Sequence, residues 1–251
     1  MTNATVLGVD IGGSGIKAAP VDLDAGALLT KRQRIPTPTR STPEAVAGVV
    51  ADLAKHFDWH GPIGCTVPAV IKGGIAYSAA NIDKSWIGTD VDGVLSAATG
   101  CPVTVINDAD AAGLAEMRWG AGRGRSGVTI MVTLGTGIGS ALFVKDVLVP
   151  NTELGHLVIR GKDAEARASA NAREDHNFSW KAWAARVDEY LLYLEHLFSP
   201  DLFIIGGGVS EKADRFMPLL TAKATVVPAS MGNDAGIAGA ALAARFEHPT
   251  T

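Results

Sequence analysis

Cysteine is scarce in this chain of 251 residues. The two cysteines, Cys65 and Cys101, lie far apart, and neither belongs to a Cys-x-x-Cys pair. Because disulfide frameworks and cysteine-ligated zinc sites need closely spaced cysteines, the sequence disfavours both. We expect two buried thiols in a protein of a reducing compartment.

Long apolar runs and a surplus of positive charge are missing as well. No run approaches the ~20 apolar residues that a membrane span requires, and no basic segment precedes an apolar one at the N-terminus. The net charge of -4 provides no overall attraction to nucleic acid or to an anionic membrane. We therefore expect a cytoplasmic protein with neither nucleic-acid nor membrane partners, in which a local basic patch would bind any polyanion.

The chain has the composition of a globular protein, with 47% hydrophobic and 19% charged residues. Apolar, strand-like segments and helical patterns share its N-terminal half. The predicted strands there are 4–11, 16–22, 27–35, 63–67, 71–77 and 103–106, and the predicted helices are 44–57 and 109–119. The order of strand, glycine turn and strand begins again at Gly127, with strands 128–134 and 138–144, which indicates an internal duplication.

The remainder of the second half also combines helical and strand-like patterns. The polar segment 162–177 predicts an exposed helix or a mobile loop. Apolar residues at helical spacing after Trp183 predict a core helix; they are Val187, Tyr190, Leu191, Leu194 and Leu197. A strand at 202–205, a helix with Ser210 as its N-cap, a strand at 225–227 and a small-residue helix ending near Phe246 follow.

Two glycine-rich turns each follow an apolar strand. They lie in Asp10–Lys17, which reads Asp-Ile-Gly-Gly-Ser-Gly-Ile-Lys, and in Leu134–Leu142, which reads Leu-Gly-Thr-Gly-Ile-Gly-Ser-Ala-Leu. Only glycine adopts positive φ freely and lets the backbone approach a polyanion, so such turns suit phosphate binding by amide N–H groups. Neither turn matches the P-loop or the dinucleotide-binding motif. The predicted phosphate-binding residues are Asp10, Gly12, Gly13, Ser14, Gly15, Lys17, Gly135, Thr136, Gly137 and Gly139.

Two polar motifs each allow two interpretations. Asp108 either caps the helix that begins there or takes a hydroxyl proton as a base, with Asn107 positioning a sugar. In Glu153-Leu-Gly-His156 the acceptor, the glycine and the imidazole suit a polyhydroxylated ligand, but a lone histidine is more often structural. The residues by themselves leave both alternatives open.

These positions, taken in order, resemble the ROK family of sugar kinases within the actin, hexokinase and Hsp70 superfamily, and especially its polyphosphate-using branch. The resemblance covers nearly the whole chain. It includes both glycine turns, the loop Asn81-Ile-Asp-Lys-Ser-Trp86, Asn107-Asp108, Glu153-x-x-His156 and Gly206-Gly-Gly-Val-Ser210. It implies an α/β protein with the actin-like or hexokinase-type fold, in which two duplicated domains flank a cleft. We place these domains at 1–107 and 108–233, with a C-terminal helix at about 234–247 packing back on the first.

The resemblance also assigns roles to residues. Asp108 is the expected catalytic base on the 6-hydroxyl of the sugar, and Asp10 is the expected Mg²⁺ ligand. The expected sugar-binding residues are Asn81, Asn107, Asp108, Glu153 and His156, with Glu174 as a weaker match. The expected nucleotide-binding residues are Gly206, Gly207, Gly208 and Val209.

One departure from the family pattern refines the expectation. Typical members carry a cysteine-rich zinc motif after the Glu-x-Gly-His segment, whereas residues 157–251 contain no cysteine. We therefore expect no zinc, and we expect transfer of a phosphoryl group from inorganic polyphosphate to glucose, with ATP as a possible second donor. Candidates for a basic polyphosphate path are Lys17, Lys84, Arg123, Arg125, Arg160 and Lys162.

Two other functions remain as alternatives. One is an ATP-dependent kinase for another hexose, such as mannose or N-acetylmannosamine, because the sequence does not settle which hydroxyl groups are recognised. The other is a non-catalytic sugar-binding regulator, which is disfavoured because the first strand begins by about residue 4 and leaves no room for a DNA-binding helix-turn-helix before it. A homodimer is expected by analogy with the family.

Overall fold

The computed structural model describes residues 5–80 and 82–247. The chain forms two compact units. One comprises the chain up to Ala115 and the segment from Asp234 onward, and the other comprises Glu116–Asn233. The division falls within helix α3 (Asp108–Arg118) and not after residue 107, where the sequence pattern put the domain boundary.

A mixed sheet forms the centre of the first unit. Its strands are β1 (Thr5–Ile11), β2 (Ile16–Asp22), β3 (Ala27–Leu28), β4 (Gln33–Ile35), β5 (Ile63–Val67) and β8 (Val103–Asn107). The strand order is β3-β2-β1-β5-β8, with β4 also paired to β2. The β1–β2 pair is antiparallel, while β1–β5 and β5–β8 are parallel. The predicted strand 27–35 is thus two short strands, both paired with β2.

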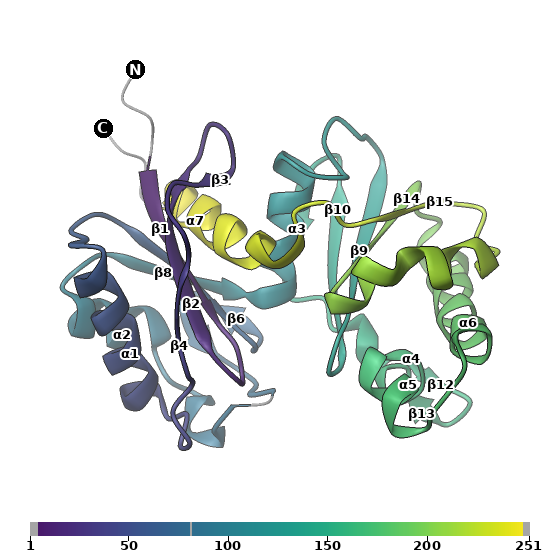
Figure 1. Ribbon diagram of the computed structural model, residues 1–251, viewed down its shortest axis with the longest axis horizontal. Helices are drawn as coiled ribbons and strands as arrows, with labels where there is room; N and C mark the ends of the chain where they lie inside the picture. Colours follow the sequence, from purple (N-terminus) through teal and green to yellow (C-terminus); the bar gives the residue numbers. More distant parts are fainter. Residues whose placement is uncertain (1–4, 81, 248–251) are drawn as a thin grey trace. The chain divides into compact units, whose positions relative to one another are not determined.

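Helices cover both faces of this sheet (Figure 1). They are α1 (Pro43–His56), α2 (Val91–Thr99) and α7 (Ala235–Glu247). Leu7 and Val9 belong to the buried cluster that contains the apolar residues of α1 and α2. Because side chains alternate along a strand, Gly8 faces the other way, where a Cβ atom would clash with the backbone carbonyl of Ile237 in α7. The C-terminal helix therefore packs closely on the first unit.

Smaller elements complete this unit. Ile71–Lys72 (β6) and Ile75–Ala76 (β7) form a two-stranded hairpin, and Lys84–Trp86 is the 3-10 helix η1. The hairpin replaces the single strand predicted at 71–77 because Gly73 and Gly74 adopt positive φ and reverse the chain.

The second unit repeats the strand order of the first. Its strands are β9 (Val128–Leu134), β10 (Ile138–Val144), β11 (Val147–Val149), β14 (Leu202–Gly206) and β15 (Thr225–Pro228). They are ordered β11-β10-β9-β14-β15, with antiparallel pairing from β11 to β9 and parallel pairing from β9 to β15. Two sheets of one topology confirm the predicted fold class and the internal duplication.

Helix α6 (Trp180–Phe198) supplies much of the second core. Trp183, Val187, Tyr190, Leu191 and Leu194 are buried, as their helical spacing predicts. Leu197 was expected on the same face, but this was wrong, because its side chain is 52% exposed and Phe198 contacts the core instead.

The segment 162–177, expected to be an exposed helix or a mobile loop, contains three short elements, which are β13 (Lys162–Asp163), α4 (Glu165–Ala168) and α5 (Ala170–Asp175). Two more short elements precede it, η2 (Leu154–His156) and β12 (Val158–Ile159). The small side chains of Ala164, Ala168 and Ala172 are buried and anchor this segment to the unit.

The remaining short helices are η3 (Gly208–Arg215), η4 (Met217–Leu219) and η5 (Gly232–Asp234). Ser210 lies inside η3 and donates its hydroxyl to the carbonyl of Gly207, so the prediction that it caps a helix was wrong. Among the described residues, none of the helices combines the length and apolar character needed to cross a membrane.

Candidate active site

The first glycine turn joins β1 to β2. The N–H of Gly12 donates to the carbonyl of Gly15 at 3.2 Å. Neither residues 12–15 nor residues 135–139 include a glycine with positive φ, so the conformational reason given for these glycines was wrong. A Cβ on Gly15 would lie 2.5 Å from Nε of Arg34, and a Cβ on Gly137 would lie 2.5 Å from Oε2 of Glu165, so a larger residue at either position would displace one of these side chains, whereas Gly135 has no neighbouring atom within 4 Å of such a Cβ.

Asp10 lies at the end of β1, opposite Lys17 of β2. Its Oδ2 is 3.3 Å from Nζ of Lys17, and its Oδ1 accepts a hydrogen bond of 2.9 Å from the hydroxyl of Thr66. Thr66 is fully buried and also accepts from the N–H of Ile11 at 3.1 Å. The carboxylate is therefore held on both oxygens while 21% of the Asp10 side chain stays exposed.

Arg34 of β4 contacts this hairpin, and the sequence motifs did not reveal it. It is the cross-strand partner of Lys17 in the β2–β4 pair, and its NH2 donates to the carbonyl of Ser14 at 2.7 Å. Two cations thus adjoin the predicted phosphate turn. The only signal in the sequence was the basic residue inside a strand, which by itself does not indicate which turn it contacts.

Asn107 and Asp108 lie where β8 passes into α3. The amide oxygen of Asn107 accepts from the N–H groups of Ala109 and Asp110, at 2.9 and 3.1 Å, and its Nδ2 donates to the carbonyl of Ala69. Capping is therefore performed by Asn107, while Asp108 is exposed and accepts from the N–H of Ala109. Of the other predicted sugar-binding residues of this unit, Asn81 lies outside the described residues.

The second unit brings the predicted phosphate-binding and nucleotide-binding segments to one cavity. The turn is closed by the N–H of Gly135, which donates to the carbonyl of Gly137 at 3.0 Å. A cavity of about 240 Å³ is lined in part by Gly135, Thr136, Gly208 and Val209. Gly207 has a φ of 83°, and a Cβ there would also clash with the carbonyl of Leu134, so this position requires glycine.

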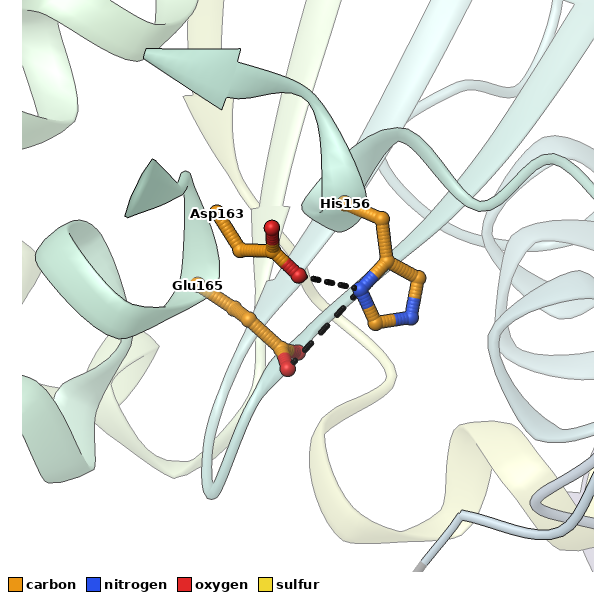
Figure 2. Close-up of side chains that lie close together, drawn as sticks. All are labelled: His156, Asp163 and Glu165. Carbon is orange, nitrogen blue, oxygen red and sulfur yellow. Dashed lines mark hydrogen bonds and ion pairs between the residues drawn. The ribbon is translucent and has the colours of Figure 1, made fainter. Parts of the chain in front are cut away.

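The side chains of His156, Asp163 and Glu165 lie close together (Figure 2). Nδ1 of His156 lies 3.0 Å from Oδ2 of Asp163 and 4.0 Å from Oε1 of Glu165. The hydrogen bond with Asp163 is the main cause that raises the pKa of His156. Glu153 joins this group through Nε2 of His156, which lies 3.9 Å from its Oε2.

Burial raises the pKa of Glu153, and the nearby Glu165 adds to this effect while His156 opposes it. The carboxylates offer several hydrogen-bond acceptors, and the imidazole offers N–H donors whose number depends on its protonation. Such a set of groups suits the binding of sugar hydroxyl groups. Asp163 and Glu165 were not among the predicted site residues. Their only signal was that both are acidic and follow His156 closely.

Glu165 also connects this cluster with the second glycine turn. Its Oε2 accepts from the N–H of Ile138 at 3.3 Å. Glu174, which the family pattern offered as a weak match for a sugar-binding acid, lines the cavity beside Gly135 instead. Among the described residues, Glu165 and not Glu174 is the glutamate after His156 that lies beside its ring.

The same three residues form the candidate metal site of the described chain. One ligand atom each from His156, Asp163 and Glu165 lie within 4.8 Å of one another. Imidazole nitrogen with carboxylate oxygen is a donor set that suits a divalent transition metal. This donor set contains no cysteine, because residues 157–251 have none.

Comparison with known proteins agrees with this architecture. A family model described as the ROK family matches residues 6–168. The chain belongs to the ROK family. The predicted family membership is thus confirmed.

Among curated members of the ROK family, the chain is similar to a polyphosphate glucokinase of Mycobacterium tuberculosis. The two are 49% identical over 237 residues, which cover 94% of this chain and 89% of the relative.

Solved ROK family structures show the same similarity. The inorganic polyphosphate/ATP-glucomannokinase of Arthrobacter sp. strain KM has 50% identity and a TM-score of 0.94, with 98% of this chain and 100% of that chain covered. A ROK family glucokinase of Streptomyces griseus, solved with glucose and AMPPNP, has 26% identity and a TM-score of 0.80, covering 97% and 100% of the two chains.

Proposed function

We propose that this chain is a polyphosphate glucokinase, which transfers a phosphoryl group from inorganic polyphosphate to the 6-hydroxyl of glucose. The observation that carries the proposal is the identity of 49% to a protein named polyphosphate glucokinase and of 50% to a protein named inorganic polyphosphate/ATP-glucomannokinase, each over nearly the whole chain. ATP is proposed as a second donor, because the chain keeps the Gly206–Val209 turn beside the cavity.

Asp108 is the proposed base. Because Asn107 supplies the cap to the first N–H groups of α3, the Asp108 carboxylate is exposed. In the reaction it accepts the proton of the sugar 6-hydroxyl as the oxygen attacks phosphorus, and the shortened polyphosphate leaves. The same base serves either donor.

Asp10 is the proposed residue for Mg²⁺. The ion usually keeps several waters and borrows one or two carboxylates, which fits a single, partly exposed carboxylate between Thr66 and Lys17. When bound, Mg²⁺ neutralises charge on the transferred phosphoryl group. Lys17 of β2 and its cross-strand partner Arg34 of β4 add positive charge beside the first glycine turn.

The acidic and imidazole groups of the second unit are the proposed sugar-binding set. Glu153, whose pKa is raised by burial, and His156 accept or donate to hydroxyl groups other than the reacting one. Asp163 orients the ring of His156 through the contact with Nδ1. Asn107 has less to offer a sugar than predicted, because its amide oxygen already accepts two backbone N–H groups.

The test combines both donors with several acceptors. Purified protein is assayed with glucose, mannose and N-acetylmannosamine against polyphosphate and ATP; the phosphorylated sugars are separated by ion-exchange chromatography, glucose 6-phosphate is also detected by a coupled dehydrogenase, and sugar binding is measured by calorimetry. We expect the highest kcat/KM with glucose and polyphosphate. Turnover of N-acetylmannosamine with ATP alone would replace this proposal with the ATP-dependent alternative, and sugar binding without turnover would favour a regulator.

A substitution tests the base. Asp108→Asn should lower kcat by at least about 100-fold, because general-base catalysis contributes factors of this order, while glucose binding by calorimetry stays within a few-fold. Asp52→Asn, on the exposed face of α1, is the matched control and should leave kcat unchanged. The homodimer implied by the family is checked on the same samples by light scattering.

A further inference from the structure

The cavity beside the second glycine turn carries more positive charge than the glycine motifs indicate. Besides Gly135 and Gly208, its lining includes Arg173, Trp180 and Lys212. None of these three residues belongs to a recognised motif, and none was among the predicted site residues. We call this space the Arg173 cavity.

Arg173 is held in one place by two contacts. Its guanidinium carbon lies 4.2 Å from the centroid of the Trp180 ring, and its NH1 donates to the carbonyl of Phe178 at 3.2 Å. Trp180 in turn stacks on Phe216, with 15° between the ring planes. A guanidinium has five N–H donors in a rigid plane, so most of its donors remain for a ligand after the bond to Phe178.

The charge of this cavity is not cancelled by ion pairs. Within residues 5–80 and 82–247, neither Arg173 nor Lys212 lies within 4.0 Å of a carboxylate oxygen, although Glu174 is part of the lining. The lining therefore carries two positive charges, of the partly buried Arg173 and the exposed Lys212, against one negative charge, and this excess of positive charge attracts anions.

A second, larger depression provides a useful contrast. It is lined by Arg160, Arg167 and Arg186 on the outer side of α6, with a volume of about 770 Å³. Glu189 pairs with both Arg160 and Arg167, at 2.5 and 2.6 Å. Much of the positive charge of this depression is therefore neutralised, which argues against Arg160 as part of a polyphosphate path.

We propose that Arg173 determines donor preference by binding a non-transferred phosphate of polyphosphate while covering the face of Trp180. A planar guanidinium donates two parallel hydrogen bonds to a phosphate. An uncovered indole face would instead stack on a purine base. Arg173 thus strengthens polyphosphate binding, and by covering the Trp180 ring it prevents the adenine of ATP from stacking there. This inference rests on the proposed function.

Arg173→Gln tests the inference, because it removes the charge and the planar cation while keeping a polar side chain. We expect the KM for polyphosphate to rise about tenfold, the loss that follows from one charge-assisted contact, with kcat within a few-fold. The KM for ATP should stay the same or fall. Lys212→Gln should raise the polyphosphate KM less, because the Lys212 side chain is exposed.

Arg186→Gln is the matched control. Arg186 lies on the same unit and its guanidinium covers an aromatic ring in the same way, 4.1 Å from the centroid of Phe178, but it lines the larger depression. This variant should leave the ratio of the two donor KM values unchanged. An equal effect of Arg173→Gln and Arg186→Gln on that ratio would overturn the inference.

Calorimetric titration of polyphosphate without glucose separates this inference from the proposed function. Weaker polyphosphate binding by Arg173→Gln than by the unchanged protein supports the inference whatever the turnover. Equal binding and equal KM values in both proteins refute it, even if the unchanged protein phosphorylates glucose from polyphosphate. Arg173→Lys keeps the charge without the planar fork, and we expect an intermediate KM for polyphosphate.

Discussion

The hydroxyl of Thr66 donates to Oδ1 of Asp10 at 2.9 Å and accepts from the N–H of Ile11 at 3.1 Å. The second bond leaves the hydroxyl proton free to point at the carboxylate. A fully buried threonine of β5 thereby orients the residue that we propose for Mg²⁺. Thr66 is a positioning residue, because it acts through Asp10.

Thr66→Val should weaken Mg²⁺ binding by about 10-fold to 100-fold, as loss of an outer-sphere hydrogen bond does at metal sites. Valine has nearly the shape of threonine but does not accept from the N–H of Ile11, so we expect the fold to persist with its stability lowered by about 1–3 kcal/mol. Binding of Mn²⁺ followed by electron paramagnetic resonance measures the loss without turnover. Thr66→Ser, which keeps the hydroxyl, should restore binding, and failure of this rescue would contradict the positioning role.

The fully buried carboxylate of Glu116 accepts three backbone N–H groups, from Ala121, Ser230 and Met231, at 2.7 to 2.9 Å. Glu116 and Ser230 both lie close to the ends of Glu116–Asn233, where the chain passes between the units. Glu116→Ala should lower the free energy of unfolding by about 3 kcal/mol, since the donors would be left unpaired. Urea denaturation checks this, with the exposed Glu211→Ala as a control expected to change stability by less than about 0.5 kcal/mol.

Gly64 lies in β5 directly beneath α7. A Cβ atom on Gly64 would clash with the backbone carbonyl of Ala240, so Gly64→Ala should lower the unfolding free energy by about 1–3 kcal/mol. Gly48 lies on the exposed face of α1, where a Cβ atom would meet no neighbouring atom within 4 Å. Gly48→Ala should therefore raise the unfolding free energy by about 1 kcal/mol. Thermal unfolding measures both changes, and equal decreases in the two melting temperatures would contradict this packing.

Asp163→Asn should lower the pKa of His156, because the hydrogen bond that the His156 ring donates to the Asp163 carboxylate is the largest cause of its raised value. A raised pKa means that the folded state stabilises the imidazolium. The resulting contribution of His156 to the free energy of unfolding is fully present below the unfolded pKa of about 6.5, and it is lost as the pH rises through the folded pKa. NMR titration of the His156 ring measures the shift, and an unchanged pKa would show that Asp163 does not control this ring.

The stability difference between the unchanged protein and Asp163→Asn should accordingly be larger at pH 5.5 than at pH 9. We expect it to stay below about 1 kcal/mol, because the His156 side chain is 56% exposed and solvent screens the pair. Asp214→Asn, at an 80% exposed aspartate, should show no such pH dependence.

The strands and the glycine turns were predictable because they depend on local pattern. Alternating apolar residues and short glycine connections specify the hairpins of β1 with β2 and of β9 with β10, and the structure has both. The errors arose where local pattern was insufficient. Ser210 has the chemistry of an N-cap but lies within η3, and Leu197 has the spacing of a core residue but lies in the last turn of α6.

The candidate site was only partly predictable. Glu153 and His156 were recognised from one short motif, but Glu165 reaches them only because β12, β13 and the start of α4 return the chain to η2. Arg34 contacts the turn at Ser14 through the pairing of β4 with β2, which the sequence presented as one continuous strand.

The sequence by itself determined the two strand-turn-strand hairpins, the family and the chemistry of the motif residues, because these depend on residues near one another in the chain. Only the tertiary structure decided that Thr66 orients Asp10, that Glu165 joins His156 and that Arg173 lies on Trp180. Each of these contacts requires chain segments to meet through sheet pairing or helix packing. Contacts of that kind depend on the geometry of the folded backbone and leave no periodic signal in the sequence.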